Sequence, residues 1–297
     1  MCGIMGHYSF GNTLPDKEKI AAMFSLLETR GRDACGWAFV NENQLYVHKA
    51  PIKSSLMIQT KEWKGLELQK MMIFHTRAAT QGDAKNNVNN HPLFNKLGVC
   101  IVHNGIIHND LEIFSKDKRD GQVDSEAILT VLSSKGKGNK VKRVFDRLDG
   151  SFAFAAISRN EPEKLIIVKK DNPVDLYYDS VDDILYFCSE RRIMQEALEL
   201  KTDSFRGFNI GEGSFHFYEM KNNHALIINA DGVESYERYS PRKFTYRNSD
   251  FLYPSQQDEL IIECPHCLST TRYYMGKLFN RCESCGLEID EEDLYYV

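Results

Sequence analysis

Two cysteine pairs near the end of the chain constrain its folding more than any other feature. Cys264 and Cys267 form one C-x-x-C pair, fourteen residues follow, and Cys282 and Cys285 form the second. Two short turns of this kind can place four thiolates tetrahedrally, which is the geometry of a structural zinc site. A segment of about 40 residues has too little core to fold unaided, so bound metal would supply its stability. The pairs therefore predict one Zn²⁺ per chain in a separate small module; four unrelated thiols are the alternative.

The rest of the composition points to a cytoplasmic protein with reduced thiols. The eight cysteines of the 297-residue chain occur without a secretion signal, which favours thiols or metal ligands over disulfides. No apolar run approaches the roughly 20 residues that a membrane helix needs. The net charge of −5 gives no global signature of nucleic-acid or membrane binding.

Local patterns predict an α+β protein. Helical periodicity occurs mainly in the first half, as in the segment that Pro15 opens and Arg30-Gly31 closes. Strand patterns dominate after Ser151, including a hairpin expected to pair 214–220 with 225–229. Many strands joined by tight turns predict packed antiparallel sheets covered by helices. The expected domains are residues 1–238, a non-periodic linker at 239–257, and the metal module at 258–297.

The chain starts with a candidate nucleophile. Cys2 follows the initiator methionine and is small enough for that methionine to be removed. The exposed α-amine, with a pKa of about 7.7–8.0, can then take the proton of the Cys2 thiol. The thiolate is the nucleophilic form of cysteine. The alternative is that Cys2 is only a small residue at the start of a strand.

Five motifs together resemble a known family. They are Met1-Cys2-Gly3-Ile4, Arg30-Gly31-Arg32-Asp33, His75-Thr76-Arg77, His91-Pro92 and His103-Asn104-Gly105. Their order and spacing resemble the glutaminase domain of class II glutamine amidotransferases, most closely the front half of glucosamine-6-phosphate synthase. Leu148–Phe152 and Ser189-Glu190 extend the likeness, which covers roughly residues 1–235. The resemblance implies an N-terminal nucleophile (Ntn) hydrolase fold, a four-layer αββα sandwich. It also implies hydrolysis of L-glutamine to glutamate and ammonia through a cysteinyl thioester, without a cofactor.

The chemistry of amide hydrolysis gives these residues roles. Attack by Cys2 on a carbonyl creates an oxyanion, which needs pre-aimed donors. Asn104 can supply a side-chain N–H and Gly105 a backbone N–H. Alternatively, Asn104-Gly105 is only a type I′ hairpin turn.

The far end of glutamine carries a carboxylate and an ammonium. The fork of Arg77 suits the carboxylate, and Asp124 suits the ammonium. Asp124 could instead be an ordinary N-cap, because it precedes an apolar helical pattern. The resemblance adds Thr80 and Arg30 as further glutamine-site residues.

Three positions depart from the family pattern. Ala78 stands where the family has tryptophan, Gln81 where it has histidine, and Ala34 where it has serine. The first two lie on a loop that covers the site in the family, so their replacement puts the coupling to an acceptor in doubt.

The four-cysteine module resembles a zinc ribbon. His266 lies between the first two cysteines and is not expected to be a metal ligand.

The linker contains a mixed basic and aromatic pattern. Its members are Arg238, Arg242, Lys243 and Arg247 with Tyr239, Phe244 and Tyr246. This mix can hold single-stranded nucleic acid, or can be an amphipathic segment lying on the main domain. The acidic end, Asp290–Asp293, argues against a nucleic-acid face.

The sequence thus predicts a glutamine amidotransferase subunit whose ammonia goes to an acceptor handled by a separate protein. One alternative is a zinc-ribbon binding or scaffold protein with a degenerate glutaminase domain. Another is an Ntn amidohydrolase acting on a different amide, although Arg77 and Asp124 favour an α-amino acid.

Overall fold

The chain forms two compact units, Met1–Arg242 and Lys243–Val297. The computed structural model describes residues 2–114, 119–134, 138–201, 208–210, 213–215, 220–242, 244, 259–264, 266–267, 269–274, 280–285 and 287–289. The first unit extends past the predicted end at 238, because the Tyr239 ring stacks on Phe145 with centroids 5.1 Å apart. The Arg242 N–H also donates to the Phe145 carbonyl at 3.0 Å. Most of the predicted linker at 239–257, namely residue 243 and residues 245–257, lies outside the described residues.

The first sheet, sheet A, has six antiparallel strands in the order β3-β2-β4-β1-β10-β9. They are β1 (Gly3–Ser9), β2 (Ala34–Asn41), β3 (Gln44–Ala50), β4 (Met71–Arg77), β9 (Asp175–Asp179) and β10 (Ile184–Cys188). The first strand of the chain lies in the middle of this sheet, where Gly3 pairs with Thr76 of β4. This pairing brings the start of the chain beside the end of β4.

The second sheet, sheet B, also has six antiparallel strands, in the order β14-β13-β8-β7-β6-β5. They are β5 (Leu93–Phe94), β6 (Val99–Ile107), β7 (Gly150–Ser158), β8 (Glu161–Lys170), β13 (His224–Asn229) and β14 (Gly232–Arg238). The predicted pairing of 214–220 with 225–229 is wrong, because β13 has β8 on one side and β14 on the other. The short strands β11 (Phe208–Ile210) and β12 (Gly213–Phe215) pair with each other instead.

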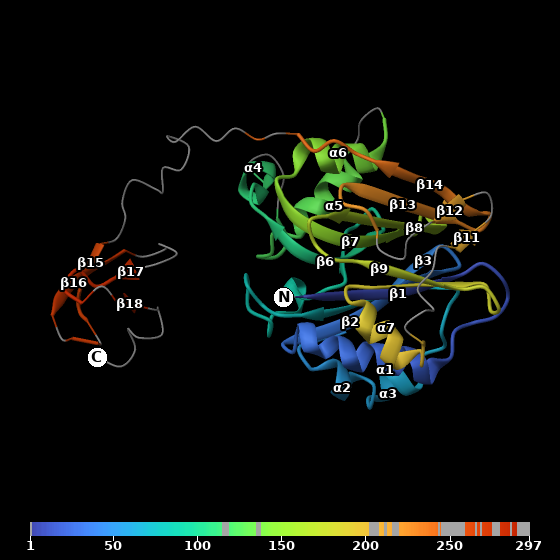
Figure 1. The fold of residues 1–297 in the computed structure, drawn as a ribbon, viewed down its shortest axis with the longest axis horizontal. Coiled ribbons are helices and arrows are strands. Elements are labelled where there is room, and N and C mark those ends of the chain that lie inside the picture. The colour runs from blue at the N-terminus through green and yellow to red at the C-terminus, as the bar shows by residue number, and fades with distance from the viewer. Residues whose placement is uncertain are drawn as a thin grey trace. The chain divides into compact units, whose positions relative to one another are not determined.

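Helices cover the outer face of each sheet (Figure 1). On sheet A lie α1 (Lys17–Leu26), the 3₁₀ helix η1 (Leu27–Arg30), α2 (Ser54–Met57), α3 (Lys61–Lys64) and α7 (Arg191–Ala197). On the side of sheet B lie α4 (Asp110–Phe114), α5 (Glu126–Ser133) and α6 (Lys140–Arg147), and the 3₁₀ helix η2 (Asn87–Asn89) precedes β5. Side-chain caps begin four of them; for example, Asp16 accepts from the Glu18 N–H at the start of α1, and Asn139 accepts from the Val141 N–H at the start of α6.

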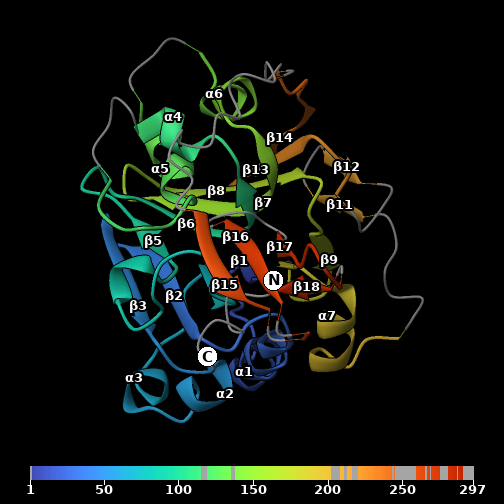
Figure 2. The same ribbon diagram turned by 90° about the vertical axis from the view of Figure 1, so that its left-hand side faces the viewer.

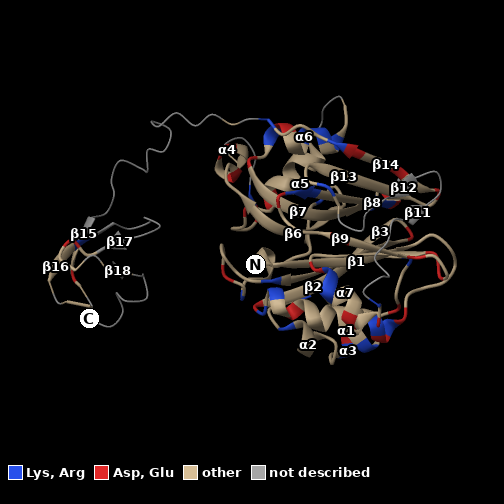
Figure 3. Ribbon diagram, in the orientation of Figure 1, with Lys and Arg blue, Asp and Glu red and all other residues tan. Residues whose placement is uncertain are grey.

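Alternating side chains divide the interior into three apolar layers. Ile4 and Tyr8 of β1 face the core between the sheets, whereas Met5 faces the helices on sheet A. A third cluster lies between sheet B and its helices. Figure 2 shows the sheets and their covering helices from another side, and Figure 3 shows Lys, Arg, Asp and Glu on helices and loops and also on strands such as β14. The predicted four-layer αββα sandwich is confirmed.

The described residues of the C-terminal unit lie mostly in β-strands. Its strands are β15 (Glu259–Glu263), β16 (Thr270–Tyr274), β17 (Asn280–Arg281) and β18 (Glu288–Ile289), which form two antiparallel pairs. Its buried cluster in the described residues consists of Cys264, Cys282 and Ile289. So small a core matches the expectation that metal stabilises the module. Among the described residues of both units, no helix is long and apolar enough to cross a membrane.

Candidate active site and candidate metal centre

Cys2 lies just before β1, where the two sheets approach each other. Its half-buried Sγ donates to the Ala78 carbonyl at 3.5 Å. Burial raises the pKa of the Cys2 thiol, and the positive charge of Arg77 opposes that rise. A thiol in this setting needs a base to become a nucleophile, and the α-amine of a mature Cys2 could serve as that base.

A small cavity adjoins Cys2. Its lining is Cys2, Arg77, Ala78, Thr80, Gln81, His91, His103, Gly105, Val123, Asp124 and Ser125. Five residues predicted from the sequence therefore converge on one cavity, although they come from four separate parts of the chain. The cavity measures about 20 Å³, which is room for roughly one water molecule. Two larger cavities, of about 580 and 340 Å³, contain none of the predicted residues.

Arg30 holds the segment that contains Cys2 in place. Its Nε donates to the Cys2 carbonyl at 3.0 Å, and its Nη1 pairs with Glu190 at 2.8 Å. These contacts favour a positioning role for Arg30; the glutamine contact predicted from the family resemblance is not tested by them. Glu190 belongs to the Ser189-Glu190 landmark, and the Ser189 hydroxyl accepts from the Ile4 N–H at 3.0 Å. Both residues of that landmark thus anchor the first residues of the chain.

Arg77 is buried at the end of β4 and organises the loop that follows it. Its Nη1 donates to Asn90 Oδ1 at 2.8 Å, and its Nη2 donates to the carbonyls of Gln81 and Gly82. Gly31 lets a neighbouring segment pass directly against this region, because a Cβ there would lie 2.3 Å from the Arg77 carbonyl carbon. The guanidinium thus lies at the cavity with its fork engaged by loop carbonyls.

Asn104 and Gly105 lie within strand β6, so the hairpin-turn alternative is wrong. The strand continues to Ile107, and Gly105 pairs with Phe152 of β7. Gly105 has φ +146°, a conformation that L side chains rarely adopt. The Asn104 Nδ2 is buried and has no hydrogen-bond partner among the described residues. An unpaired buried donor costs about 1–3 kcal/mol, and this one belongs to the residue next to Gly105, which lines the Cys2 cavity, whereas Asn104 itself is not part of that lining.

Asp124 does not cap α5. Ser125 occupies the N-cap position, and the Asp124 Oδ2 instead accepts from the Ile107 N–H at 2.6 Å. The Asp124 N–H donates to Gln81 Oε1 at 3.2 Å. The Gln81 side chain, which stands where the family has histidine, therefore connects the loop after β4 (the covering loop, residues 78–82) to Asp124. Thr80, on the same loop, is exposed and lines the cavity.

Three buried histidines behind the site were not among the predicted site residues. His75 Nε2 donates to the His103 carbonyl at 2.8 Å, and the rings of His75 and His91 stack with centroids 4.2 Å apart. His103 Nδ1 bonds the Ser125 hydroxyl at 2.7 Å. Burial lowers the pKa of all three, that of His75 to about 3, so they are neutral near pH 7. All three stood in the quoted motifs, but residue type alone does not separate a histidine that lines a site from a histidine buried in the core.

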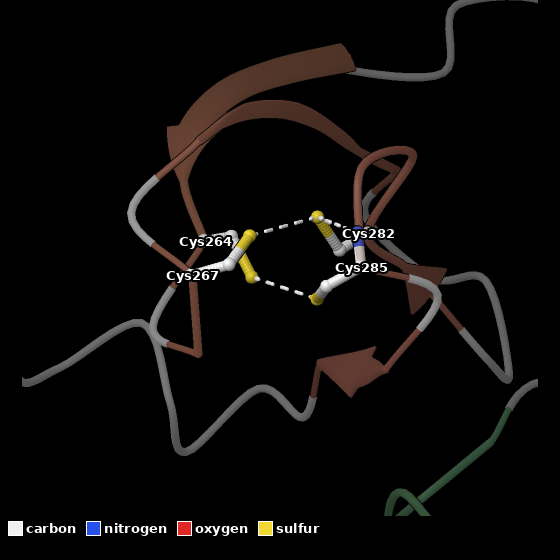
Figure 4. A group of neighbouring side chains, drawn as sticks. All are labelled: Cys264, Cys267, Cys282 and Cys285. Atoms are coloured by element: carbon white, nitrogen blue, oxygen red, sulfur yellow. Dashed lines mark hydrogen bonds between the residues drawn. The ribbon is translucent and has the colours of Figure 1, made fainter.

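The four C-terminal cysteines form a candidate metal centre (Figure 4). Their sulfur atoms all lie within 4.8 Å of one another. The Cys264–Cys285 and Cys267–Cys282 sulfur pairs are 3.8 and 3.6 Å apart. Sulfur atoms arranged tetrahedrally about 2.3 Å from a zinc ion would be about 3.8 Å apart, so the observed spacing fits zinc. The N–H groups of Cys285 and Ser284 donate to the Cys282 sulfur and lower the pKa of that thiol, which favours its thiolate form.

One aromatic residue of the linker pattern, Tyr239, is packed into the first unit. Tyr239 is buried against Phe145, and its hydroxyl accepts from Asn139 Nδ2 at 2.8 Å. Its ring is therefore covered and cannot stack on a nucleic-acid base. This contact supports the alternative of a segment lying on the main domain, at least for its first residues.

Comparisons with known proteins find similar sequences and similar folds. A family model described as a glutamine amidotransferase domain matches residues 75–196. The chain is 33% identical over 186 residues to a glutamine–fructose-6-phosphate aminotransferase (isomerizing) of Aquifex aeolicus, and 32% identical over 188 residues to the Thermococcus kodakarensis protein of that name. Each match covers 59% of this chain and 30% of the relative, so the chain matches less than a third of these relatives' length.

Solved structures show the same fold. Glutamine phosphoribosylpyrophosphate amidotransferase from B. subtilis superposes with a TM-score of 0.62 and 19% identity, over 81% of this chain and half of that one. A structure described as the allosteric regulatory enzyme of purine biosynthesis gives a TM-score of 0.61 at 20% identity, with the same coverage.

Proposed function

We propose that this chain contains a class II glutamine amidotransferase domain and hydrolyses L-glutamine to glutamate and ammonia with Cys2 as the nucleophile. One observation carries the proposal: Cys2, Arg77, Gly105 and Asp124 converge on one cavity. The unpaired Asn104 Nδ2 argues against an inactive scaffold, because a buried donor without a use would cost stability.

The reaction follows from the groups present. After removal of Met1, the α-amine of Cys2 takes the thiol proton, and the thiolate attacks the amide carbon of glutamine. The oxyanion formed there accepts hydrogen bonds from Asn104 Nδ2 and the Gly105 N–H. Collapse of this intermediate expels ammonia, which leaves with the proton from the amine. A water molecule then attacks the thioester, releasing glutamate and restoring the Cys2 thiol.

The other end of glutamine is recognised by charge. Asp124 accepts from the α-ammonium, and Arg77 donates to the α-carboxylate. Thr80 lies on the loop at the carboxylate end. Because Arg77 already holds the carbonyls of Gln81 and Gly82, carboxylate binding requires it to exchange or share these partners.

Substrate entry requires the covering loop to move. A cavity of about 20 Å³ is far smaller than glutamine, and Ala78, Thr80 and Gln81 of the loop after β4 line it. Gln81, in place of the family's histidine, joins that loop to Asp124 through a single hydrogen bond of 3.2 Å. Loop opening therefore breaks this bond and exposes Asp124 and Arg77 together.

We also propose that the C-terminal unit holds one structural Zn²⁺ through Cys264, Cys267, Cys282 and Cys285. The ion would stabilise the small module and would take no part in hydrolysis. Because this unit exposes apolar side chains such as Ile261 and Leu287, we propose that it docks a separate protein that holds the ammonia acceptor.

The test is glutamate release by the purified chain, alone and with proteins that co-purify with it. We expect Cys2-dependent glutamate release that rises when the acceptor protein is added. Absence of glutamate release under both conditions contradicts the glutaminase proposal. Full activity that no co-purifying protein changes, and that survives removal of the C-terminal unit, contradicts the docking proposal.

A further inference from the structure

One side chain outside the cavity bonds the peptide that joins Asn104 to Gly105. Asn172, in the segment after β8, donates from Nδ2 to the Asn104 carbonyl at 2.8 Å. The same nitrogen lies 3.3 Å from the Ser151 carbonyl of β7, so one amide group bridges β6 and β7. None of the motifs that suggested the active site includes this residue.

The geometry of a peptide bond gives this contact a consequence. In a trans peptide the C=O and the following N–H lie in one plane and point in opposite directions. The Asn104 carbonyl and the Gly105 N–H belong to the same peptide. Gly105 lines the Cys2 cavity, whereas Asn172 does not. A group that holds the carbonyl on one side therefore sets the direction of the N–H on the cavity side.

The approach of Asn172 also explains why residue 105 is glycine. A Cβ on Gly105 would lie 2.5 Å from Asn172 Nδ2 and 2.1 Å from the Ser151 carbonyl oxygen. Both distances are too short for any side chain. Only glycine at position 105 therefore allows both the φ of +146° and the close approach of Asn172.

Asn172 is itself held by a neighbouring pair. Asp171 adopts φ +68°, and its N–H donates to Asn222 Oδ1 at 2.6 Å. Asn222 Nδ2 donates back to Asp171 Oδ1 at 2.5 Å. These two bonds fix the turn from which Asn172 projects, because Asn222 lies in the separate turn before β13.

We propose that Asn172 is the positioning residue that aims the Gly105 N–H at the oxyanion, with the Asp171–Asn222 pair holding it in place. The inference rests on the proposed function, since it assigns a supporting residue to the same reaction. Asn172 touches neither substrate nor nucleophile. Asn172 should affect the stability of the tetrahedral intermediate more than the binding of glutamine, because the ground-state amide depends less on the Gly105 N–H.

Steady-state kinetics of Asn172→Ala and Asn172→Asp test the proposal. Removing an oxyanion donor costs about 10²–10³ in kcat, so losing its aim should lower kcat by about 10- to 100-fold while KM stays the same. The ionised Asp side chain keeps the shape but has no N–H to donate, so it should be as impaired as Ala. Asn160→Ala is the matched control, because Asn160 makes a similar bond, to the Leu97 carbonyl at 3.0 Å, in an exposed turn.

Two binding measurements separate positioning from general damage. An aldehyde such as 5-oxopentanoate can add to Cys2 and form a tetrahedral adduct, so its inhibition constant should rise by the factor by which kcat falls. The Kd of L-glutamate should be unchanged. Wild-type kcat in both variants overturns the inference. Equal losses of glutamate affinity and kcat do so too, because they would show damage to the whole site.

A crystal structure of Asn172→Ala gives a readout that does not depend on turnover. The proposal expects the Asn104–Gly105 peptide to rotate from its present orientation, and an unmoved peptide overturns it. If the wild-type protein released no glutamate, the proposed function would fail. The structure of the variant would still decide whether Asn172 orients this peptide.

Discussion

Replacing Asp124 with asparagine should weaken glutamine binding while leaving the fold intact. Asp124 is buried at the cavity, and its Oδ2 accepts from the Ile107 N–H at 2.6 Å. The asparagine oxygen can accept the same bond, so the end of β6 keeps its partner. The asparagine N–H₂ would then face the α-ammonium of glutamine, where two donors meet without a compensating charge.

The magnitude follows from the bond that is lost. A hydrogen bond to a charged group contributes about 1.5–3 kcal/mol, so KM for glutamine should rise roughly ten- to a hundred-fold with little change in kcat. Asp124→Ala should behave differently, because it leaves the buried Ile107 N–H unpaired. That loss should lower the free energy of unfolding by about 1–3 kcal/mol.

The assay uses glutamine and its analogue without the α-amino group, 5-amino-5-oxopentanoate. The wild-type enzyme should prefer glutamine in kcat/KM, and Asp124→Asn should lose most of that preference. Asp120→Asn, which changes an exposed carboxylate nearby, is the control and should behave as wild type. If Asp124→Asn kept the full preference for glutamine, Asp124 would not be the ammonium-binding group.

Three further predictions follow from the structure. Asn104→Ala should lower kcat by about a hundred-fold or more with little change in KM, because it removes an oxyanion donor; an effect on KM alone would refute that role. Truncation after Arg242 should abolish zinc binding, measured by metal analysis, and leave glutamate release; stoichiometric zinc in the folded fragment would place the ligands elsewhere. Burial lowers the pKa of His7 to about 4 and that of His75 to about 3, so the unfolded chain binds protons first as the pH falls below about 6.5. The free energy of unfolding should therefore fall between about pH 6.5 and 5, by up to about 1.4 kcal/mol per pH unit for each histidine, and a flat urea-denaturation profile there would contradict the neutral buried state.

Sequence patterns predicted the layers of the fold but not the pairing of all its strands. Apolar alternation marks β1 and β4 as strands, yet nothing local to Gly3 indicates that it pairs with Thr76. The error at β13 has the same origin. A turn at Lys221–Asn223 predicts a hairpin, but β13 pairs with β8 and β14, because tertiary packing outweighs local turn chemistry.

The candidate site shows the same division between short motifs and long-range contacts. Asn104-Gly105 has the sequence of a hairpin turn. It lies instead within β6, because β7 pairs with that strand as far as Ile107. Asp124 looks like an N-cap, but its carboxylate bonds Ile107, which only the fold brings near. The role of Asn172 depends on a contact across 68 residues and has no motif. By contrast, each C-x-x-C turn is local, so the spacing of the four cysteines is enough to predict that their sulfur atoms lie together.

The central claim is that a mature N-terminal Cys2 attacks glutamine. Intact-mass spectrometry of active protein treated with a diazoketone analogue of glutamine tests it most directly. The account predicts that Met1 is absent, that each chain carries one adduct, and that Cys2→Ala carries none. Active protein that retains Met1, or that carries the adduct on another residue, would contradict it.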